Sequence, residues 1–163
     1  MVIMVTGLPG SGKSFFASRL AKSLEATYLS SDIIRKEIIE VRQYSEEEKE
    51  KIYKEMLSRM LQALTNRECV VLDATFYKKN LRTRFSEAAK KHSVKFRQIK
   101  IEAEESIIRE RLSHRREHSD ADWEVYQLLS RQYENIDGEH LVLQSGRANI
   151  KTMQEKALHY LRH

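Results

Sequence analysis

The chain has 163 residues and a net charge of +5, with 40% apolar residues, 33% charged residues, one proline and five glycines. This composition is typical of a helix-rich globular chain and excludes disordered and fibrous proteins. No segment has the roughly 18 consecutive apolar residues of a membrane span, and the single cysteine, Cys69, cannot form an internal disulfide, so we expect a cytoplasmic protein without membrane contact.

Apolar stretches typical of strands alternate along the chain with amphipathic stretches typical of helices. We expect strands over Val2–Thr6, Thr27–Leu29, Cys69–Asp73, Val94–Ile101 and Leu141–Gln144. Helices are expected over about 13–24, from about 31, and over about 45–64, 78–91, 104–111, 121–134 and 149–161. Strands that alternate with helices pair in parallel through right-handed crossovers. The prediction is therefore one α/β domain over residues 1–163, with a doubly wound parallel sheet and a buried, structural Cys69.

The turn after the first strand reads Gly7-Leu8-Pro9-Gly10-Ser11-Gly12-Lys13-Ser14, which fits the P-loop pattern G-x-x-x-x-G-K-[ST]. The glycines allow backbone N–H groups to surround phosphates, Lys13 reaches the β and γ oxygens, and the Ser14 hydroxyl binds magnesium. A motor ATPase has a glutamate after its strand-end aspartate and a GTPase has Asn-Lys-x-Asp, and neither feature occurs here. The motif predicts binding of a nucleoside triphosphate with Mg²⁺, and the missing features favour a kinase.

Polar residues at the ends of the second and third strands are candidates for the acceptor side. Asp32 and Arg35 lie one helical turn apart, so a carboxylate base and an acceptor-binding guanidinium would face the same crevice. The alternative is a helix cap at Ser31 or Asp32 with Arg35 exposed. Asp73 ends the third strand, where a carboxylate supports magnesium or orients the acceptor, and Thr75 lies in the same crevice.

The region 76–116 carries thirteen lysines or arginines against five glutamates, an excess that suits phosphate-bearing ligands or, alternatively, forms a solvated helix face. Its last part, about 109–122, is a predicted lid in which Arg111 and Arg115 approach the triphosphate. Trp123 and Tyr126, at helical spacing, are predicted to pack rather than to stack on a base. Gly146 and Arg147 either border the adenine or form a plain turn.

The ordered set of motifs resembles P-loop kinases of the AAA-type predicted-kinase family, which are similar to polynucleotide 5′-hydroxyl kinases and zeta-toxin-like kinases. The motifs are 7–14, 31–37, 71–76, 111–115 and 119–123. The resemblance implies that Asp32 is the general base, Arg35 the acceptor-phosphate ligand and Arg115 the lid arginine. It also implies five parallel strands in the order 2-3-1-4-5. The predicted nucleotide-binding residues are Gly7, Gly10, Ser11, Gly12, Lys13, Ser14, Phe15, Arg111 and Arg115.

The sequence thus predicts an ATP- and Mg²⁺-dependent kinase, with Lys13, Asp32 and Arg115 as catalytic residues and Ser14 and Asp73 at the metal. The acceptor is a hydroxyl held by Asp32, Arg35, Asp73 and Thr75, and the 5′-hydroxyl of a polynucleotide or nucleotide is favoured by the basic region and Arg35. One alternative is a kinase for sugars, antibiotics or other small molecules. The other is a nucleotide-dependent binding module or switch that hydrolyses ATP slowly.

Overall fold

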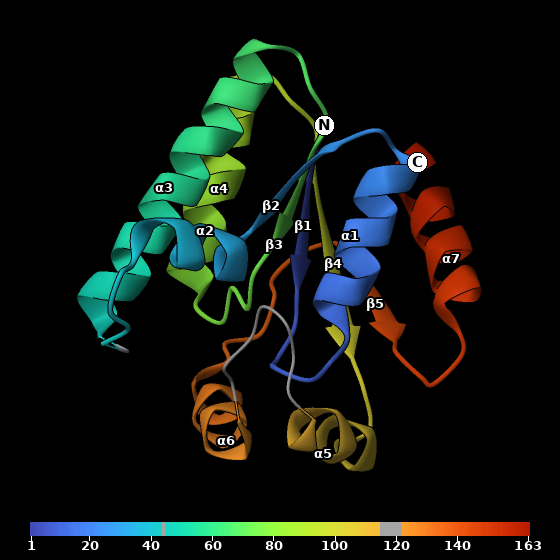
Figure 1. Cartoon of the computed structure of the whole chain (residues 1–163). Coiled ribbons are helices and arrows are strands. Elements are labelled where there is room, and N and C mark those ends of the chain that lie inside the picture. The colour runs from blue at the N-terminus through green and yellow to red at the C-terminus, as the bar shows by residue number, and fades with distance from the viewer. Residues whose placement is uncertain (44, 115–121) are drawn as a thin grey trace.

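The centre of the molecule is a five-stranded sheet, seen in the computed structural model, which describes residues 1–43, 45–114 and 122–163. The strands lie in the order β2-β3-β1-β4-β5, and each pair of neighbours is parallel (Figure 1). Their bounds are β1 Val2–Thr6, β2 Thr27–Ser30, β3 Val70–Asp73, β4 Phe96–Glu102 and β5 Leu141–Gln144. The predicted fold class and the strand order implied by the resemblance are both confirmed.

The helices begin and end close to the expected residues. They are α1 Lys13–Ser23, α2 Ser31–Ile38, α3 Glu46–Thr65, α4 Lys79–Lys91, α5 Glu105–Ser113, α6 Trp123–Gln132 and α7 Ile150–Arg162. One difference is at β4, which starts at Phe96 rather than Val94. The Val94 N–H donates to the carbonyl of Ala89, and Ser93 has φ of 56°, so these two residues complete the end of α4. Cys69 is half-buried and lies just before β3, and burial raises the pKa of its thiol.

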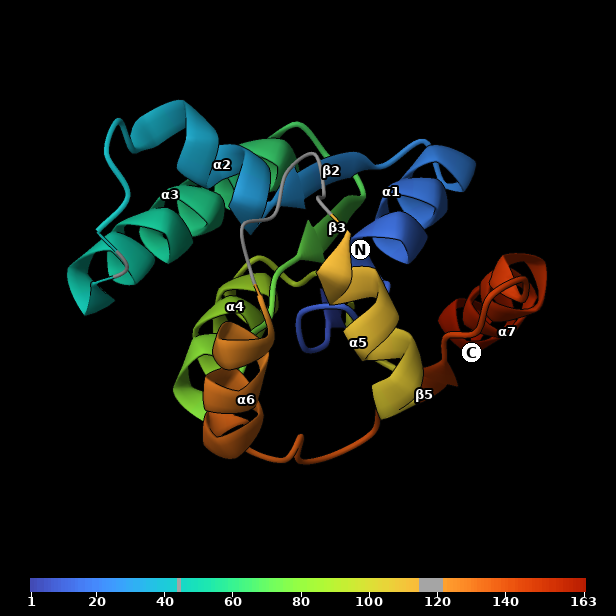
Figure 2. The ribbon, with the colours of Figure 1, turned by 60° about the horizontal axis from the view of Figure 1, so that its bottom comes forward.

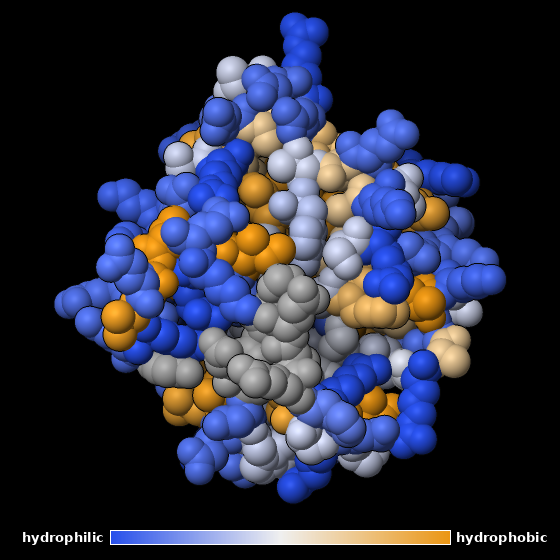
Figure 3. Space-filling view, in the orientation of Figure 1, coloured by the Kyte–Doolittle hydropathy of each residue, from blue (hydrophilic) through white to orange (hydrophobic). Residues whose placement is uncertain are grey.

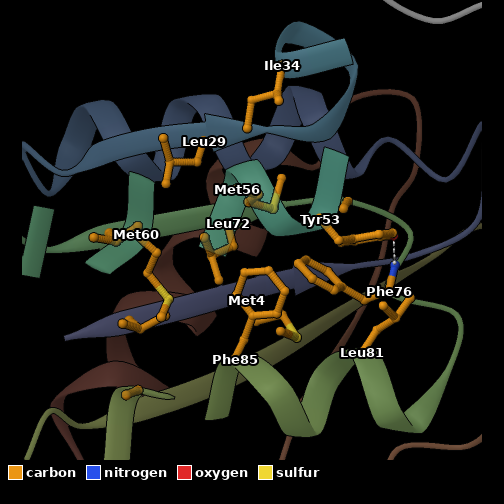
Figure 4. Close-up of a cluster of buried hydrophobic side chains, with 14 of the residues drawn as sticks. Met4, Leu29, Ile34, Tyr53, Met56, Met60, Leu72, Phe76, Leu81 and Phe85 are labelled. Atoms are coloured by element: carbon orange, nitrogen blue, oxygen red, sulfur yellow. Dashed lines mark hydrogen bonds between the residues drawn. The ribbon is translucent and has the colours of Figure 1, made fainter. Parts of the chain in front are cut away.

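Helices cover both faces of the sheet, and each face has its own hydrophobic cluster (Figure 1). On one face α2, α3 and α4 pack through Ile34, Met56 and Phe85, among others, against residues of the sheet (Figure 4). On the other face α1 and α7 contribute Phe16 and Met153, among others. All five residues of β1 are buried, because this central strand is covered on both faces. The phosphate-binding turn therefore follows a strand that is buried along its whole length.

The carboxyl ends of the strands form the edge at which the motif residues meet. In Figure 1 the strands point toward α5 and α6, while the two chain termini lie at the opposite end of the sheet. Figure 2 shows α5 and α6 side by side beyond the strand ends. The face seen in Figure 3 is largely hydrophilic, with separate apolar areas. Within the described ranges, no helix has the length and apolar character needed to cross a membrane.

Candidate functional site

The phosphate-binding turn has the backbone geometry that its glycines predict. Gly10 and Gly12 have φ of 79° and 88°, in the left-handed region where glycine avoids the penalty paid by other residues. Gly12 is the N-cap of α1, and the first turn of this helix contains no acidic residue. The positive end of the helix therefore faces the turn without a competing carboxylate, as an anion site requires.

Gly7 and Ser11 fix the shape of the turn through contacts with β4 and within the turn itself. A Cβ at Gly7 would lie 2.5 Å from the carbonyl oxygen of Ile101, so the close approach of β4 requires glycine here. The Ser11 N–H donates to the carbonyl of Leu8. Neither residue lines the nucleotide-side pocket described next, so the structure gives them a role in shaping the turn.

A pocket of about 520 Å³, which we call the nucleotide-side pocket, opens between the turn, α5 and the loop that joins β5 to α7. Six residues predicted to bind the nucleotide line it, namely Gly10, Gly12, Lys13, Ser14, Phe15 and Arg111. The ring of Phe15 is 54% exposed, with the Arg19 guanidinium 3.4 Å from its centre. Among the other lining residues are Gly146 and Arg147, the two residues considered for an adenine border.

Arg111 joins the three elements that surround this pocket. Its Nη1 donates to the carbonyl of Gly10 at 3.2 Å, and its Nη2 donates to the carbonyl of Gly146 at 3.0 Å. Burial lowers the pKa of this guanidinium, although an arginine remains protonated. A single side chain of α5 therefore holds both the phosphate-binding turn and the β5–α7 loop.

The β5–α7 wall contains residues that sequence reasoning did not assign to the site. Asn149 accepts a hydrogen bond from the Gly146 N–H and donates one to the carbonyl of Gln144, each at 2.8 Å. Ile150 and Met153 of α7 add apolar surface to the pocket. The only sequence signal was the turn residue Gly146 followed by Asn149, a residue type that hydrogen-bonds nearby backbone.

Asp73 is the most deeply buried acidic group of the site, with 1% of its surface exposed. Burial raises the pKa of its carboxyl, and Lys13 and the hydroxyls of Tyr28 and Ser14 oppose this shift. The Tyr28 hydroxyl donates to Oδ2 at 2.6 Å. The charge of Asp32 raises the pKa of Asp73 further, so Lys13, Ser14 and Asp32 all lie close enough to act on this carboxylate.

The donor set fits a magnesium ion that is shared with nucleotide phosphates. Oδ1 of Asp73 is buried and makes no hydrogen bond to any part of the chain that the structure describes. It belongs to the same carboxylate that Ser14 influences. Mg²⁺ typically binds one or two protein oxygens together with waters and substrate phosphates, which matches a hydroxyl beside a carboxylate.

Asp32 and Arg35 occupy the first turns of α2, directly after β2. The N-cap of α2 is Ser30, and its side chain makes no capping hydrogen bond among the described residues. Arg35 is buried, with 7% of its surface exposed. These observations contradict the alternative of a side-chain cap followed by an exposed arginine, because a buried guanidinium is held at a defined place at the strand ends.

Thr75 lies in the segment between β3 and α4, where its carbonyl accepts a hydrogen bond from the hydroxyl of Thr6. Thr6 is the last residue of β1, so this bond attaches the segment to the start of the phosphate-binding turn. Thr75 is half-buried and follows Asp73 by two residues. Its contact with an acceptor stays a prediction.

Arg115, the predicted lid arginine, lies outside the described residues, as do residues 115–121 of the predicted lid region 109–122. The described parts of the lid region are residues 109–114, which contain the end of α5, and Asp122, the N-cap of α6. The Arg109 guanidinium lies 3.8 Å from the Trp123 ring centre, and this ring stacks on Tyr126 at 4.7 Å. Trp123 thus has a neighbour on each face and joins α5 to α6, as its predicted packing role requires.

The basic region carries less free positive charge than its composition indicates. Of its eleven lysines and arginines that the structure describes, five form ion pairs with acidic side chains, namely Lys78, Lys79, Arg84, Lys100 and Arg109. Arg82 is buried. Ion pairing reduces the local field that a nucleic acid would meet, so the composition of the region overstates its attraction for phosphates.

The match to a family model agrees with this geometry. A model described as an AAA domain matches residues 2–136, which is most of the chain. The chain belongs to this AAA domain family. The matched range contains the phosphate-binding turn, Asp32, Asp73 and α5, and it ends just after α6.

Solved structures share the fold over almost the whole chain. A sugar kinase from Janibacter sp. HTCC2649 superposes with a TM-score of 0.77 at 16% identity, covering 99% of this chain and 94% of its own. Chaetomium thermophilum Kti12 in complex with ADP-AlF3 gives 0.75 at 23%, covering 98% of both chains. The Mycobacterium tuberculosis APS kinase in complex with AMPPNP and APS gives 0.72 at 16%, covering 99% and 97%. The chain therefore has a P-loop kinase-like fold.

Proposed function

We propose that this protein is an ATP- and Mg²⁺-dependent kinase that transfers the γ-phosphoryl group to a hydroxyl acceptor. The observation that carries the proposal is the convergence of Lys13, Ser14 and Asp32 on the buried carboxylate of Asp73. A phosphate-binding lysine, a metal-binding hydroxyl and two carboxylates at adjacent strand ends are the groups that phosphoryl transfer to a hydroxyl requires.

The residues have separate tasks in this reaction. Lys13 and the N–H groups at the start of α1 hold the β- and γ-phosphates. Ser14 and Asp73 would hold a Mg²⁺, which when bound would offset charge on the phosphates. Asp32 accepts the proton of the attacking hydroxyl as the new O–P bond forms. The bond between the γ-phosphorus and its bridging oxygen breaks, and ADP leaves with that electron pair.

Arg35 and the basic region 76–116 are the features that bear on the class of acceptor. Arg35 is buried and lies one helical turn after Asp32. Its guanidinium can bind a phosphate or carboxylate on the acceptor, and this supports a polynucleotide or nucleotide that accepts the phosphoryl group at its 5′-hydroxyl. The ion pairing of the basic region favours a second candidate, a small-molecule kinase, and so do neighbours named as a sugar kinase and an APS kinase.

The deciding experiment follows labelled γ-phosphate from ATP with Mg²⁺ to a 5′-hydroxyl oligonucleotide, to small-molecule hydroxyls and to a sample without acceptor. Label in the oligonucleotide would support a 5′-hydroxyl polynucleotide as the acceptor. Label only in a small molecule would support the small-molecule kinase instead. Phosphate release alone, with no labelled acceptor, would point to a switch and refute the kinase.

Two variants test the role of the base. Asp32→Asn is expected to lower transfer by about 100-fold or more while leaving ATP affinity nearly unchanged, because general-base catalysis contributes about 10²–10⁴ in rate. Glu37→Gln, which alters an exposed carboxylate of the same helix paired with Arg59, is the matched control and is expected to transfer normally. Unchanged transfer by Asp32→Asn would exclude Asp32 as the base.

A separate variant, Lys13→Ala, tests the phosphate-binding turn and is expected to be inactive with every acceptor.

A further inference from the structure

Arg82, in α4, connects two segments that lie far apart in the sequence. It is 4% exposed, and its Nη1 donates to the carbonyl of Phe76 at 2.7 Å. Its Nη2 donates to the carbonyls of Glu134 and Asn135 at 2.9 and 2.7 Å. We call residues 74–78 the acceptor loop, because they follow Asp73 and contain Thr75, and residues 133–137 the α6 exit. One buried guanidinium therefore holds the acceptor loop and the α6 exit together.

A second set of hydrogen bonds joins the same two segments to the end of β1. The Thr6 hydroxyl donates its only proton to the carbonyl of Thr75, so the Tyr133 hydroxyl is the donor in its 2.9 Å bond to Thr6. The Glu134 N–H donates to the carbonyl of Tyr77 at 2.8 Å. The acceptor loop, the α6 exit and the residue before the phosphate-binding turn are thus bonded in one network.

The acceptor loop contains a backbone conformation that needs such support. Phe76 has φ of 45°, a left-handed value that is unfavourable for a bulky side chain. Its N–H donates to the Tyr53 hydroxyl, and its ring packs against Tyr53 and Phe85 with centres 5.4 and 5.2 Å apart (Figure 4). Strained residues persist only where their surroundings fix them, and they concentrate near functional sites. The carbonyl that Arg82 binds is that of Phe76 itself.

The network continues from α6 to the nucleotide-side pocket. Arg109 of α5 lies over Trp123 of α6, and Arg111 of α5 binds the carbonyl of Gly10 in the phosphate-binding turn. α5 and α6 therefore connect the nucleotide-side pocket to the α6 exit. Figure 2 shows α5 and α6 side by side. Arg82 then joins the α6 exit to the acceptor loop, through the carbonyls of Glu134 and Phe76.

We propose that Arg82 is a positioning residue that couples nucleotide binding to the placement of the acceptor loop. The proposal rests on the kinase function proposed above, and Arg82 acts through the backbone carbonyls that it binds and through the Tyr133 ring, whose centre lies 5.8 Å from its guanidinium. With Arg82 in place, the loop after Asp73 is set for the acceptor when the nucleotide is bound. Without it, ATP still binds, but water competes with a misplaced acceptor for the γ-phosphate.

The variant Arg82→Lys tests this coupling, because an ammonium is a point donor and does not reproduce the planar fork that reaches both segments. The kcat for transfer is expected to fall about 10- to 100-fold, as displacements near 1 Å do, while KM for ATP stays within about twofold. The ratio of ATP hydrolysed to phosphoryl transferred is expected to rise by the same factor of about 10 to 100, because hydrolysis continues while transfer falls. Arg84→Lys, on the same helix in a pair with Glu50, is the control and is expected to keep the wild-type ratio.

A purely structural role for Arg82 would lower transfer and hydrolysis together, and an unchanged ratio would overturn the proposal. Tyr133→Phe provides a test if Arg82→Lys folds poorly, because it removes only the hydroxyl that binds Thr6. It is expected to raise the ratio in the same direction by a smaller factor. A wild-type ratio for Tyr133→Phe would then count against the network.

Hydrogen exchange separates this inference from the kinase proposal. Binding of AMPPNP with Mg²⁺ is expected to slow exchange of the amides of residues 76–79 in the wild type and not in Arg82→Lys. This readout needs no acceptor, so it decides the role of Arg82 even if no hydroxyl receives phosphate and the kinase proposal fails. Equal slowing in the two proteins, or no slowing in the wild type, would overturn the coupling.

Discussion

Two glycines form a matched pair that measures how closely α5 is held against the phosphate-binding turn. Gly10 and Gly138 share a φ of +79°. A Cβ at Gly138 would meet no atom of the described residues within 4 Å, whereas at Gly10 it would lie 2.9 Å from Cγ2 of Ile108 and 3.1 Å from Cγ of Leu112. Replacement by alanine thus adds the same backbone penalty at both positions and a steric penalty only at Gly10.

The expected magnitudes follow from these distances. The left-handed conformation costs alanine about 1–2 kcal/mol, partly offset by about 0.4–1 kcal/mol because alanine loses less backbone entropy on folding. Gly138→Ala should therefore cost about 1 kcal/mol. Overpacking against α5 adds about 1–3 kcal/mol at Gly10. With about 2–4 °C per kcal/mol for a chain of this size, Tm should fall by about 2–4 °C for Gly138→Ala and about 4–16 °C for Gly10→Ala.

Thermal unfolding followed by circular dichroism measures both variants, and titration with AMPPNP and Mg²⁺ measures binding. Gly10→Ala is expected to bind the nucleotide about tenfold or more weakly, since about 1.4 kcal/mol of displaced contacts at the phosphates is enough for that factor. Gly138→Ala is expected to bind normally. Equal losses of Tm in the two variants would refute the close contact between α5 and the turn.

Two further variants test the charged groups of the site. For Asp73, burial holds the folded-state pKa above the usual 3.8, so its stabilising contribution is present below that pH and is lost as pH rises through the folded-state pKa. Asp73→Asn should therefore have a higher Tm than the wild type at pH 7, with a gain that shrinks toward pH 4, and a lower Tm at pH 7 would contradict this. For Arg111→Met, loss of charge-assisted hydrogen bonds of about 1.5–3 kcal/mol predicts about 10- to 100-fold weaker AMPPNP binding, and unchanged calorimetric affinity would remove Arg111 from the nucleotide site.

Much of the fold is encoded in local patterns, which explains why it was predictable. The apolar run of β1 and the turn from Gly7 to Ser14 occupy consecutive residues, and the rule for parallel crossovers then predicts that the strands pair in parallel with helices on both faces. Asp32 and Asp73 became candidates for the same local reason, since Asp73 ends a strand and Asp32 lies two residues after one. The strand order itself came from the resemblance and not from periodicity.

Contacts between distant segments were not predictable from the sequence. Arg111 and Gly146 are 35 residues apart, and Arg82 and Asn135 are 53 apart, so no local spacing connects them. Arg82 looked like one member of a basic run, and only its burial separates it from the paired and exposed cations around it. The extent of ion pairing in that run depends in the same way on partners from other elements, such as Glu50 of α3.

The strand order also has a consequence for self-association. β2 and β5, which occupy the two edges of the sheet, have four residues each, so each edge offers only a short row of unpaired backbone groups to another molecule. Val142 of β5 is 43% exposed, but its strand neighbour Gln144 is exposed and polar. The net charge of +5 adds repulsion between copies. Edge-to-edge pairing of sheets is therefore disfavoured, and the chain should stay dispersed at the high concentrations that calorimetry requires.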